Sequence, residues 1–283
     1  MKTVSSPQEI LSISKKLKAA GKKIGFVPTM GFLHEGHLSL IRESKKKCDV
    51  TFVSVFVNPT QFGPSEDFNN YPRDINRDKN LLKNEKVDFL FLPLTEEIYP
   101  QNFQTYVNVE HITKKLEGEF RPTHFRGVGT VVLILFNCVQ PDYAFFGQKD
   151  AQQLAVIKQM AEDLKLDIQI IGCPIIRESD GLAMSSRNIY LSTDERKDAL
   201  VLNKSLILAK QMIAEGEKKV NRILSEMHEL ISSVTTAKLD YIKIVEANTF
   251  EIINELLSGN EVYILIACRI GKTRLIDNVK IKV

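Results

Sequence analysis

The chain has 283 residues, of which 38 are basic and 35 acidic, so its formal net charge is only +3. This balance argues against nucleic acid or an anionic membrane as the main partner, because both require a strongly basic surface. Hydrophobic residues make up 43% of the chain and charged residues 26%, which is typical of a globular protein with one large or two smaller domains.

Cysteine usage and the length of the apolar runs indicate a cytoplasmic protein. Cys48, Cys138, Cys173 and Cys268 are widely spaced, unlike the cysteines of a zinc site or a disulfide framework. The N-terminus has no apolar core of signal-peptide length, and the longest apolar run, 131–136, is far too short to span a bilayer. We therefore expect reduced thiols and no membrane partner.

The first part of the chain predicts strands that alternate with helices. Ser6, Pro7 and Glu9 form a helix start, with a serine cap, a proline in the first turn and a glutamate placed for a capping box. Strands are predicted at 24–27, 50–57, 87–92, 106–109, 143–146 and 168–172, helices at 7–20, 37–47, 74–85, 130–139 and 150–164, and a loop at 121–129. This spacing is typical of βαβ units and a parallel sheet.

The remainder of the chain has a different pattern. A second capping box, Ser192 to Glu195, opens the first of two predicted helices, and three strands follow at 239–246, 261–269 and 274–283. Gly271 separates the last two strands, as in an antiparallel hairpin. We predict an α/β protein with a Rossmann-like doubly wound parallel sheet in residues 1–176 and a smaller α+β domain in residues 177–283.

The stretch IGFVPTMGFLHEGHLSLI, residues 24–41, is a candidate nucleotide site. It predicts a strand, a glycine-containing turn and a helix start, with His34 and His37 at the junction. A helix N-terminus attracts phosphate, and two imidazoles can donate hydrogen bonds to phosphate oxygens. The pair also fits surface residues, a helix cap or half of a metal site, although no cysteine or further histidine lies close in sequence to complete one.

Five polar or glycine-containing segments follow predicted strand ends. They are 28–37, 58–62, the loop through Tyr71 and Arg73, 146–149, and the linker 184–187. Ligands of open parallel sheets bind outside the carboxyl ends of the strands, so these segments together indicate one ligand site.

Each of these segments has a chemical interpretation and a plainer one. Lys149 after Gly147 supplies a mobile charge for phosphate, but the pair also fits a strand terminator and a solvated lysine. The segment 185–187 can bind a polyphosphate through two hydroxyls and a guanidinium, or it can be an ordinary linker. Gln61 and Gln153 are amides suited to an acid that must stay ionised, or simply polar residues.

Six motifs, in their order and spacing, resemble the pantothenate synthetase (pantoate–β-alanine ligase) family: PTMGFLHEGH, FVNPTQFG, YPRD, RPTHFRGV, FGQKDAQQ and LAMSSRN. The resemblance covers essentially the whole chain. It extends more distantly to nucleotidyltransferases and class I aminoacyl-tRNA synthetases, whose His-x-x-His-type and Lys-Met-Ser-Lys-Ser-type signatures correspond to HEGH and MSSRN. It implies a Rossmann-like fold, ATP and Mg²⁺ as requirements, and a homodimer formed through the first domain.

The resemblance implies a reaction in two steps. The carboxylate of pantoate would attack the α-phosphate of ATP, giving an enzyme-bound pantoyl adenylate and pyrophosphate. The amine of β-alanine would then attack the acyl carbon, giving pantothenate and AMP. Negative charge builds on the phosphoryl group in the first step, and imidazoles, helix N–H groups, lysine and magnesium are suitable stabilisers of that charge.

The resemblance also implies roles for individual residues. The catalytic residues would be His34, His37, Lys149, Ser185 and Arg187. The ATP-binding residues would be these five together with Met30, Gly147, Asp150, Ile176, Met184 and Ser186. The pantoate and β-alanine site would be formed by Met30, Asn58, Gln61, Tyr71, Val131, Val132 and Gln153. Asp78 would lie near magnesium, although Arg77 beside it weakens that assignment.

Two other classes of function are weighed against this one. A nucleotidyltransferase acting on a small phosphorylated acceptor would need extra Arg or Lys in its acceptor pocket, and the FVNPTQFG loop has none. A non-catalytic nucleotide-binding module would bind without turnover. For the leading reaction we also expect the C-terminal domain to act as a lid, because the segment 185–187 lies in the linker that leads to it.

Overall fold

The computed structural model describes residues 1–64 and 66–283 and divides them into two compact units. Unit 1 comprises Met1–Gln148 and Gln152–Pro174, and unit 2 comprises Lys149–Ala151 and Ile175–Val283. The short segment Lys149–Ala151 therefore belongs with unit 2, although its sequence neighbours on both sides belong with unit 1.

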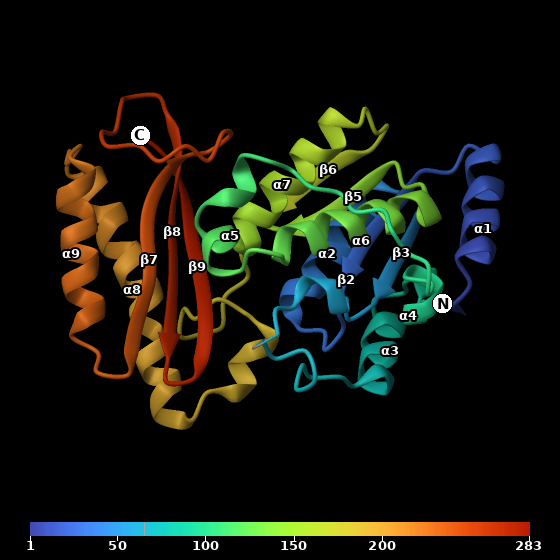
Figure 1. Cartoon of the computed structure of the whole chain (residues 1–283), viewed down its shortest axis with the longest axis horizontal. Coiled ribbons are helices and arrows are strands. Elements are labelled where there is room, and N and C mark those ends of the chain that lie inside the picture. The colour runs from blue at the N-terminus through green and yellow to red at the C-terminus, as the bar shows by residue number, and fades with distance from the viewer. Residues whose placement is uncertain (65) are drawn as a thin grey trace. The chain divides into compact units, whose positions relative to one another are not determined.

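Within the described residues, unit 1 is a six-stranded parallel sheet with helices on both faces (Figure 1). In sheet order its strands are β1 (Lys2–Val4), β4 (Phe89–Phe91), β3 (Val50–Val55), β2 (Ile24–Thr29), β5 (Tyr143–Gly147) and β6 (Gln169–Cys173). Its helices are α1 (Pro7–Ala19), α2 (Glu35–Lys47), α3 (Ile75–Asn84), α4 (Thr95–Ile98), α5 (Glu117–Phe120), α6 (His124–Val139) and, apart from its first residue, α7 (Ala151–Asp163). Short 3-10 turns are η1 (Pro59–Gln61), η2 (Ile112–Lys114) and, at the changeover between the units, η3 (Gln148–Asp150).

The central strands are mainly apolar on both sides, as expected where helices cover both faces of the sheet. In β2, Phe26 packs in a cluster with α1, α6 and α7, whereas the next residue, Val27, packs with α2 and α3. Phe52 and Val53 of β3 divide in the same way. Successive side chains of a strand point to opposite faces, so a continuous apolar run is what a doubly covered parallel strand requires.

The winding direction of the sheet reverses between β2 and β5. From β2 the chain continues to β3 and β4 on one side, whereas β5 and β6 lie on the other side. Ligands of doubly wound sheets bind outside the carboxyl ends of the strands at such a reversal. Here β2 ends directly before Met30 and β5 ends at Gly147. The predicted doubly wound α/β class is confirmed.

Unit 2 contains a three-stranded antiparallel sheet in the order β7 (Ala237–Glu246), β8 (Glu261–Ile270) and β9 (Thr273–Lys282). Helices α8 (Thr193–Ala214) and α9 (Val220–Ser232) pack on one face of it around a separate apolar cluster (Figure 1), and a 3-10 turn, η4 (Ser186–Tyr190), precedes them. The predicted β8–β9 hairpin is present, with Gly271 at a φ of 55°. The predicted capping box is also formed, because Ser192 and Glu195 each accept the other's backbone N–H.

Two predictions of local structure in unit 1 are wrong. The segment 106–109 is not a strand: the backbone N–H of Val107 donates to Thr130 Oγ1 at 2.9 Å, and Val107 and Val109 pack on the apolar cluster. The segment 121–129 is not a loop throughout, because α6 begins at His124. A Cβ at Gly127 would lie 2.4 Å from the carbonyl oxygen of Thr60, so this glycine reflects the close packing of α6 on η1 rather than a turn.

The N-terminal segment differs from expectation in two smaller ways. The strand β1 was not predicted, since three residues give too little periodicity to detect. At the start of α1, Ser6 accepts the N–H of Glu9, but the carboxylate of Glu9 bonds to Lys2 Nζ at 2.8 Å. Only the serine half of the expected capping box is therefore formed.

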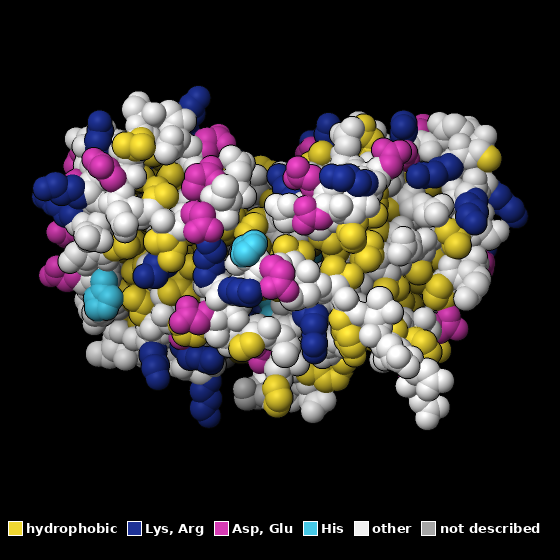
Figure 2. Space-filling model, turned by 45° about the horizontal axis from the view of Figure 1, so that its top comes forward, with side chains coloured by type: hydrophobic (Ala, Val, Ile, Leu, Met, Phe, Trp, Pro, Cys, Tyr) yellow, Lys and Arg dark blue, Asp and Glu magenta, His cyan; other side chains and the backbone are white. Residues whose placement is uncertain are grey.

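The surface agrees with the even charge balance of the sequence. On the face drawn in Figure 2, Lys and Arg side chains are interspersed with Asp and Glu side chains. Within the described part of the chain, no helix combines the length and apolar character that a membrane span requires.

Candidate functional site

The two histidines of the HEGH motif form the N-terminal cap of α2. His34 Nδ1 accepts the backbone N–H of Gly36, and His37 Nδ1 accepts the backbone N–H of His34, each at 3.2 Å. A ring nitrogen that accepts a hydrogen bond has no proton, so the neutral form of each ring has its proton on Nε2, which is then a donor. The helix-cap and phosphate-binding interpretations of the motif are therefore compatible, because the cap itself selects the tautomer that can donate to an anion.

The loop between β2 and α2 is held by Asp78. Its side chain is 1% exposed, and its two carboxylate oxygens accept the backbone N–H groups of Phe32 and Leu33, both at 2.8 Å. Burial raises the pKa of Asp78, although these two hydrogen bonds act in the opposite direction. Gly31, with a φ of 82°, supplies the left-handed backbone that the loop needs at this point.

Asp78 and its surroundings do not fit a protein-bound magnesium ion. Both carboxylate oxygens already bind backbone donors of the loop, whereas Mg²⁺ requires a set of oxygen ligands directed at the ion. In the described ranges, 1–64 and 66–283, no group of three or more His, Cys, Asp or Glu is placed to hold a metal ion. The geometry therefore gives Asp78 a structural role in positioning the histidine loop.

Met30, Gln61 and Asn58 are brought together after β2 and β3. Gln61, 7% exposed, has its Nε2 3.0 Å from Met30 Sδ, and its Oε1 accepts from Asn58 Nδ2 at 3.1 Å. Asn58 is only 1% exposed, and its buried amide is satisfied because Nδ2 also donates to the carbonyl of Gly127 and Oδ1 accepts from the hydroxyl of Tyr99. Asn58 therefore orients Gln61, and Tyr99 is a supporting residue that sequence reasoning missed.

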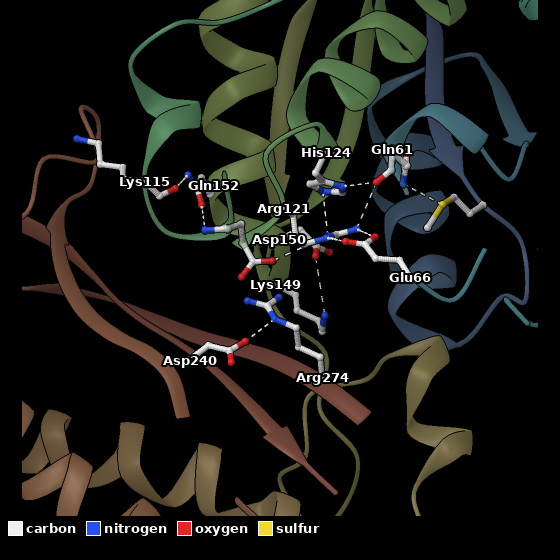
Figure 3. Close-up of polar contacts among 12 residues, drawn as sticks. Gln61, Glu66, Lys115, Arg121, His124, Lys149, Asp150, Gln152, Asp240 and Arg274 are labelled. Atoms are coloured by element: carbon white, nitrogen blue, oxygen red, sulfur yellow. Dashed lines mark hydrogen bonds and ion pairs between the residues drawn. The ribbon is translucent and has the colours of Figure 1, made fainter. Parts of the chain in front are cut away.

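A network of charged and polar groups fixes the backbone of Gln61 (Figure 3). His124 Nδ1 donates to the carbonyl oxygen of Gln61 at 2.9 Å, and Arg121 Nη1 donates to His124 Nε2 at 3.2 Å. The same guanidinium forms a two-bond ion pair with Glu66, at 2.7 and 2.8 Å. Burial opposes ionisation of Glu66, but its hydrogen bonds with Arg121 and the positive charge of that residue outweigh burial and lower the pKa of Glu66.

His124 is neutral in this network. Burial and, secondly, the adjacent charge of Arg121 lower the pKa of His124 to about 4. Both residues belong to the RPTHFRGV motif, to which the sequence analysis assigned no site residue. The available signal was a histidine and an arginine three residues apart at the start of an apolar helix, which is too common to indicate this contact.

Three other expected residues of unit 1 are buried among apolar or aromatic side chains. Tyr71 is buried, with its ring edge-on to Phe62 at 5.8 Å between centroids. Val131 and Val132 lie on α6 within the apolar cluster, each 5% exposed. Only a small part of either valine is left to contact a ligand.

The two adjacent glutamines of α7 differ in environment. Gln153 is half-buried, whereas Gln152 is 4% exposed and bonds to the backbone of three residues, Ile112, Lys115 and Glu117. Figure 3 shows Gln152 beside Lys115. Gln152 is therefore a structural residue that anchors the η2–α5 segment. Because Gln152 is buried and bonded to backbone, Gln153 is the glutamine of this pair that is able to bind a substrate.

Unit 2 contains Lys149 and Asp150 on the short segment that follows β5. The side chain of Lys149 is 19% exposed, and its Nζ lies 3.9 Å from Asp150 Oδ1, at the outer limit of an ion pair. The carbonyl oxygen of Lys149 accepts a hydrogen bond from Asn278 Nδ2 at 2.8 Å. The backbone of this lysine is therefore anchored to β9.

The other expected ATP-binding residues of unit 2 lie on a narrow loop and the turn after it. The N–H of Met184 donates to the carbonyl of Ile176 at 3.0 Å, so these two residues lie opposite each other. Ser185 caps η4 by accepting the N–H of Arg187 at 3.3 Å, and Ser186 is 7% exposed. In unit 1 the structure brings Met30, Gln61 and Asn58 into contact, and in unit 2 it places Ile176 opposite Met184 with Ser185 to Arg187 in the turn that follows.

A cavity of about 320 Å³ opens in unit 1 beyond the carboxyl ends of β2, β3 and β4. Its lining includes Met30, Phe56, Arg73 and Asp78 but neither of the two histidines nor Gln61. It therefore adjoins the candidate site at Met30 without containing its polar groups.

The pantoate–β-alanine ligase family model matches residues 2–280. The chain belongs to the pantoate–β-alanine ligase family. The family resemblance inferred from the six motifs is thereby confirmed.

Similar proteins of this family match the chain along its whole length. Pantothenate synthetase of Caldicellulosiruptor bescii is 57% identical over 282 residues, covering 100% of this chain and 99% of that protein. The crystal structure of pantothenate synthetase from Thermus thermophilus is 43% identical, covers 100% of both chains and has a TM-score of 0.92. Pantoate–β-alanine ligase from Francisella tularensis, whose crystal structure is complexed with βγ-ATP and β-alanine, is 36% identical, covers 99% of this chain and 97% of that chain, and has a TM-score of 0.79.

The His124 network predicts a pH dependence of stability. His124 has a pKa of about 4 in the folded protein and 6.5 as its reference value, so the unfolded chain binds more protons between these values. The free energy of unfolding should rise with pH across this window, by about 3 kcal/mol from this group, and should be lost again as the pH falls through it. Urea unfolding at several pH values measures the effect.

His124→Asn should remove this part of the pH dependence, since asparagine can still donate to the carbonyl of Gln61 but does not titrate. His228→Asn, at an exposed position on α9, is the matched control for loss of an imidazole. Equal slopes of unfolding free energy against pH in wild type and His124→Asn would contradict the prediction.

Proposed function

We propose that this member of the pantoate–β-alanine ligase family condenses pantoate with β-alanine to give pantothenate, AMP and pyrophosphate through a pantoyl adenylate. The observation that supports it most directly is the cap of α2 at the carboxyl end of β2. There the backbone occupies the Nδ1 atoms of His34 and His37, so both neutral rings have Nε2 protons to donate. Donors of this kind at a helix N-terminus suit the phosphates of ATP.

In the first step a carboxylate oxygen of pantoate would attack the α-phosphorus, and the bond to pyrophosphate would break. An ionised carboxylate is already a nucleophile, so this step needs no general base. The charge that develops on the phosphoryl oxygens and pyrophosphate would be stabilised by His34, His37, Lys149, Ser185, Ser186 and Arg187. Magnesium would enter with ATP, held by the phosphates, and would neutralise part of their charge.

The acid would be oriented by neutral amides. Gln61 and Gln153 can hydrogen-bond the hydroxyl and carboxylate oxygens of pantoate without adding positive charge, which would weaken the nucleophile. The present bond from Gln61 Nε2 to Met30 Sδ uses a weak acceptor, so a substrate oxygen would replace it at little cost. Val131 and Val132 would contact the methyl groups, and Tyr71 would lie near the β-alanine end.

The adenosine would contact Gly147, Asp150, Ile176, Met184 and Met30. In the second step the uncharged amine of β-alanine would attack the acyl carbon of the adenylate, AMP would leave with the electron pair of the broken C–O bond, and the nitrogen would lose one proton to solvent to give the amide. The part of the chain after Pro174 would act as a lid that closes over the bound nucleotide.

Pantoate-dependent exchange of pyrophosphate into ATP tests this proposal. We expect exchange only with pantoate present, and release of AMP only after β-alanine is added. Lys149→Met and His37→Asn should each lower the exchange rate roughly 10²–10³-fold, because each removes a donor to developing charge. In His37→Asn the asparagine oxygen can replace Nδ1 as the acceptor of the His34 backbone N–H, so the free energy of unfolding should change little.

The control substitutions are Lys158→Met and His228→Asn, both at exposed positions. Absence of pantoate-dependent exchange in the wild type would contradict the proposal, and transfer of AMP to a phosphorylated acceptor would instead support a nucleotidyltransferase.

A methyl group at Gly147 should separate ligand contact from folding. A Cβ there would meet no protein atom within 4 Å, and its φ lies outside the left-handed region. Gly147→Ala should therefore preserve stability or raise it by about 0.5 kcal/mol through the unfolded state. The KM for ATP should rise roughly tenfold, because a bound nucleotide would pack on this backbone.

Chemical unfolding and steady-state kinetics on the same preparation test this prediction. Gly129→Ala is the matched control, since a Cβ there also meets nothing closer than 3.5 Å. An unchanged KM for ATP in Gly147→Ala would exclude close approach of the nucleotide at this residue.

A homodimer and a cytoplasmic location complete the proposal. All four cysteines are free, and burial raises the pKa of the Cys138, Cys173 and Cys268 thiols to about 11, which keeps them protonated and unreactive.

For the homodimer, light scattering coupled to gel filtration should give twice the chain mass of 32.1 kDa. A single species at the mass of one chain would contradict the dimer.

A further inference from the structure

Two neighbouring buried residues of β9, Asp277 and Asn278, bond to the segments that contain the proposed phosphate-binding residues of unit 2. Asn278 is 2% exposed, and its Nδ2 donates to the carbonyl oxygen of Lys149 at 2.8 Å. Asp277 is 3% exposed and forms two hydrogen bonds with the guanidinium of Arg177, at 2.7 and 2.9 Å.

Arg177 lies at the base of the loop that leads to Ser185. It forms an antiparallel bridge with Ala183, and its Nη1 donates to the carbonyl of Gly181 at 3.0 Å. Arg177 is therefore bonded to the opposite side of its own loop at Gly181 and Ala183, and its ion pair with Asp277 attaches this loop to β9 just before Ser185.

The two contacts of β9 are also coupled to each other. Asp277 Oδ1 accepts the backbone N–H of Asn278 at 2.8 Å, so one carboxylate orders both Arg177 and the strand that presents Asn278. Buried hydrogen bonds of this kind are specific, because breaking one leaves a polar group without a partner in a low-dielectric environment.

This anchoring agrees with the division of the chain into two units. Lys149–Ala151 belongs with unit 2, although Gln148 and Gln152 belong with unit 1. The bond from Asn278 to the Lys149 carbonyl is a direct tie between this short segment and the sheet of unit 2.

We propose that Asp277 and Asn278 form a common anchor for the two phosphate-binding segments, and that Asn278 is a positioning residue for Lys149. Lys149 and Ser185–Arg187 would then move as one set with unit 2 and reach the phosphates of ATP together. This inference rests on the proposed function, since it assigns Lys149 to the adenylation step.

Comparing the two half-reactions tests the role of Asn278. Asn278→Leu keeps the approximate size of the side chain but removes the donor to the Lys149 carbonyl. We expect kcat/KM for ATP in pantoate-dependent exchange to fall roughly tenfold or more, because a small displacement of a charged group lowers transition-state stabilisation strongly. Attack of β-alanine on supplied pantoyl adenylate should change less than about twofold, since pyrophosphate takes no part in that step.

Ser205→Ala is the matched control. It removes another buried hydrogen bond of unit 2, which lies within α8 and runs from Ser205 Oγ to the carbonyl of Leu202 at 2.8 Å. Both half-reactions should be preserved in this variant. If Asn278→Leu does not fold, Asn278→Ala, which leaves room for water at the same carbonyl, replaces it in the same assays.

A double-substitution cycle completes the experiment. If Asn278 acts through Lys149, adding Asn278→Leu to Lys149→Met should cause little further loss of exchange. Equal losses in both half-reactions, full additivity in the cycle, or wild-type exchange in Asn278→Leu would each overturn the positioning role. Failure of the proposed function would appear differently, as wild-type protein without pantoate-dependent exchange.

Discussion

The reversal of winding between β2 and β5 is the constraint on which the rest of unit 1 depends. Parallel strands that are buried on both faces present their ligand-binding groups beyond their ends, because the side chains along β2 and β3 are covered and pack mainly in apolar clusters. At the reversal, the connections leaving β2 and β5 run to opposite faces of the sheet, so the chain itself leaves the ends of these strands open. Gly147 is the last residue of β5, and the HEGH cap follows the end of β2 after the short loop 30–33.

Most of the supporting structure around the site consists of buried polar groups that bind backbone. Asp78 binds two N–H groups of the histidine loop, and His124 binds the carbonyl of Gln61. Such bonds cost little when fully satisfied but are expensive to break, so they hold loops as firmly as regular secondary structure does. Loops that would otherwise be mobile can in this way present Gln61 and the histidines in defined positions.

Local patterns predicted much of this structure. The doubly wound sheet, the β8–β9 hairpin and the helix start at His34 follow from apolar periodicity and turn residues, which are properties of short segments. The same local logic failed at 121–129, where two glycines suggested a loop. The close approach of Thr60 that requires Gly127 comes from a segment far away in sequence.

The roles of the supporting residues could not be predicted for the same reason. Arg121 and His124 act on Gln61, about 60 positions earlier, and Asn278 acts on Lys149, which is 129 positions away. Sequence reasoning identified the side chains with suitable chemistry, such as Lys149 and Gln61. It had no means of identifying the residues that hold them.

The distribution of charge between the two units has a chemical logic for adenylation. A cation beside the attacking carboxylate would lower its energy before reaction and slow the attack, whereas a cation beside the departing pyrophosphate stabilises charge that grows during reaction. Under the proposed function, unit 1 would supply the amides of Gln61 and Gln153 and the imidazoles of His34 and His37, and unit 2 would supply the cationic Lys149 and Arg187. If these roles hold, the residues that bind the acid and the cations that stabilise pyrophosphate belong to different units, and the bonds of Asp277 and Asn278 would position the cationic set.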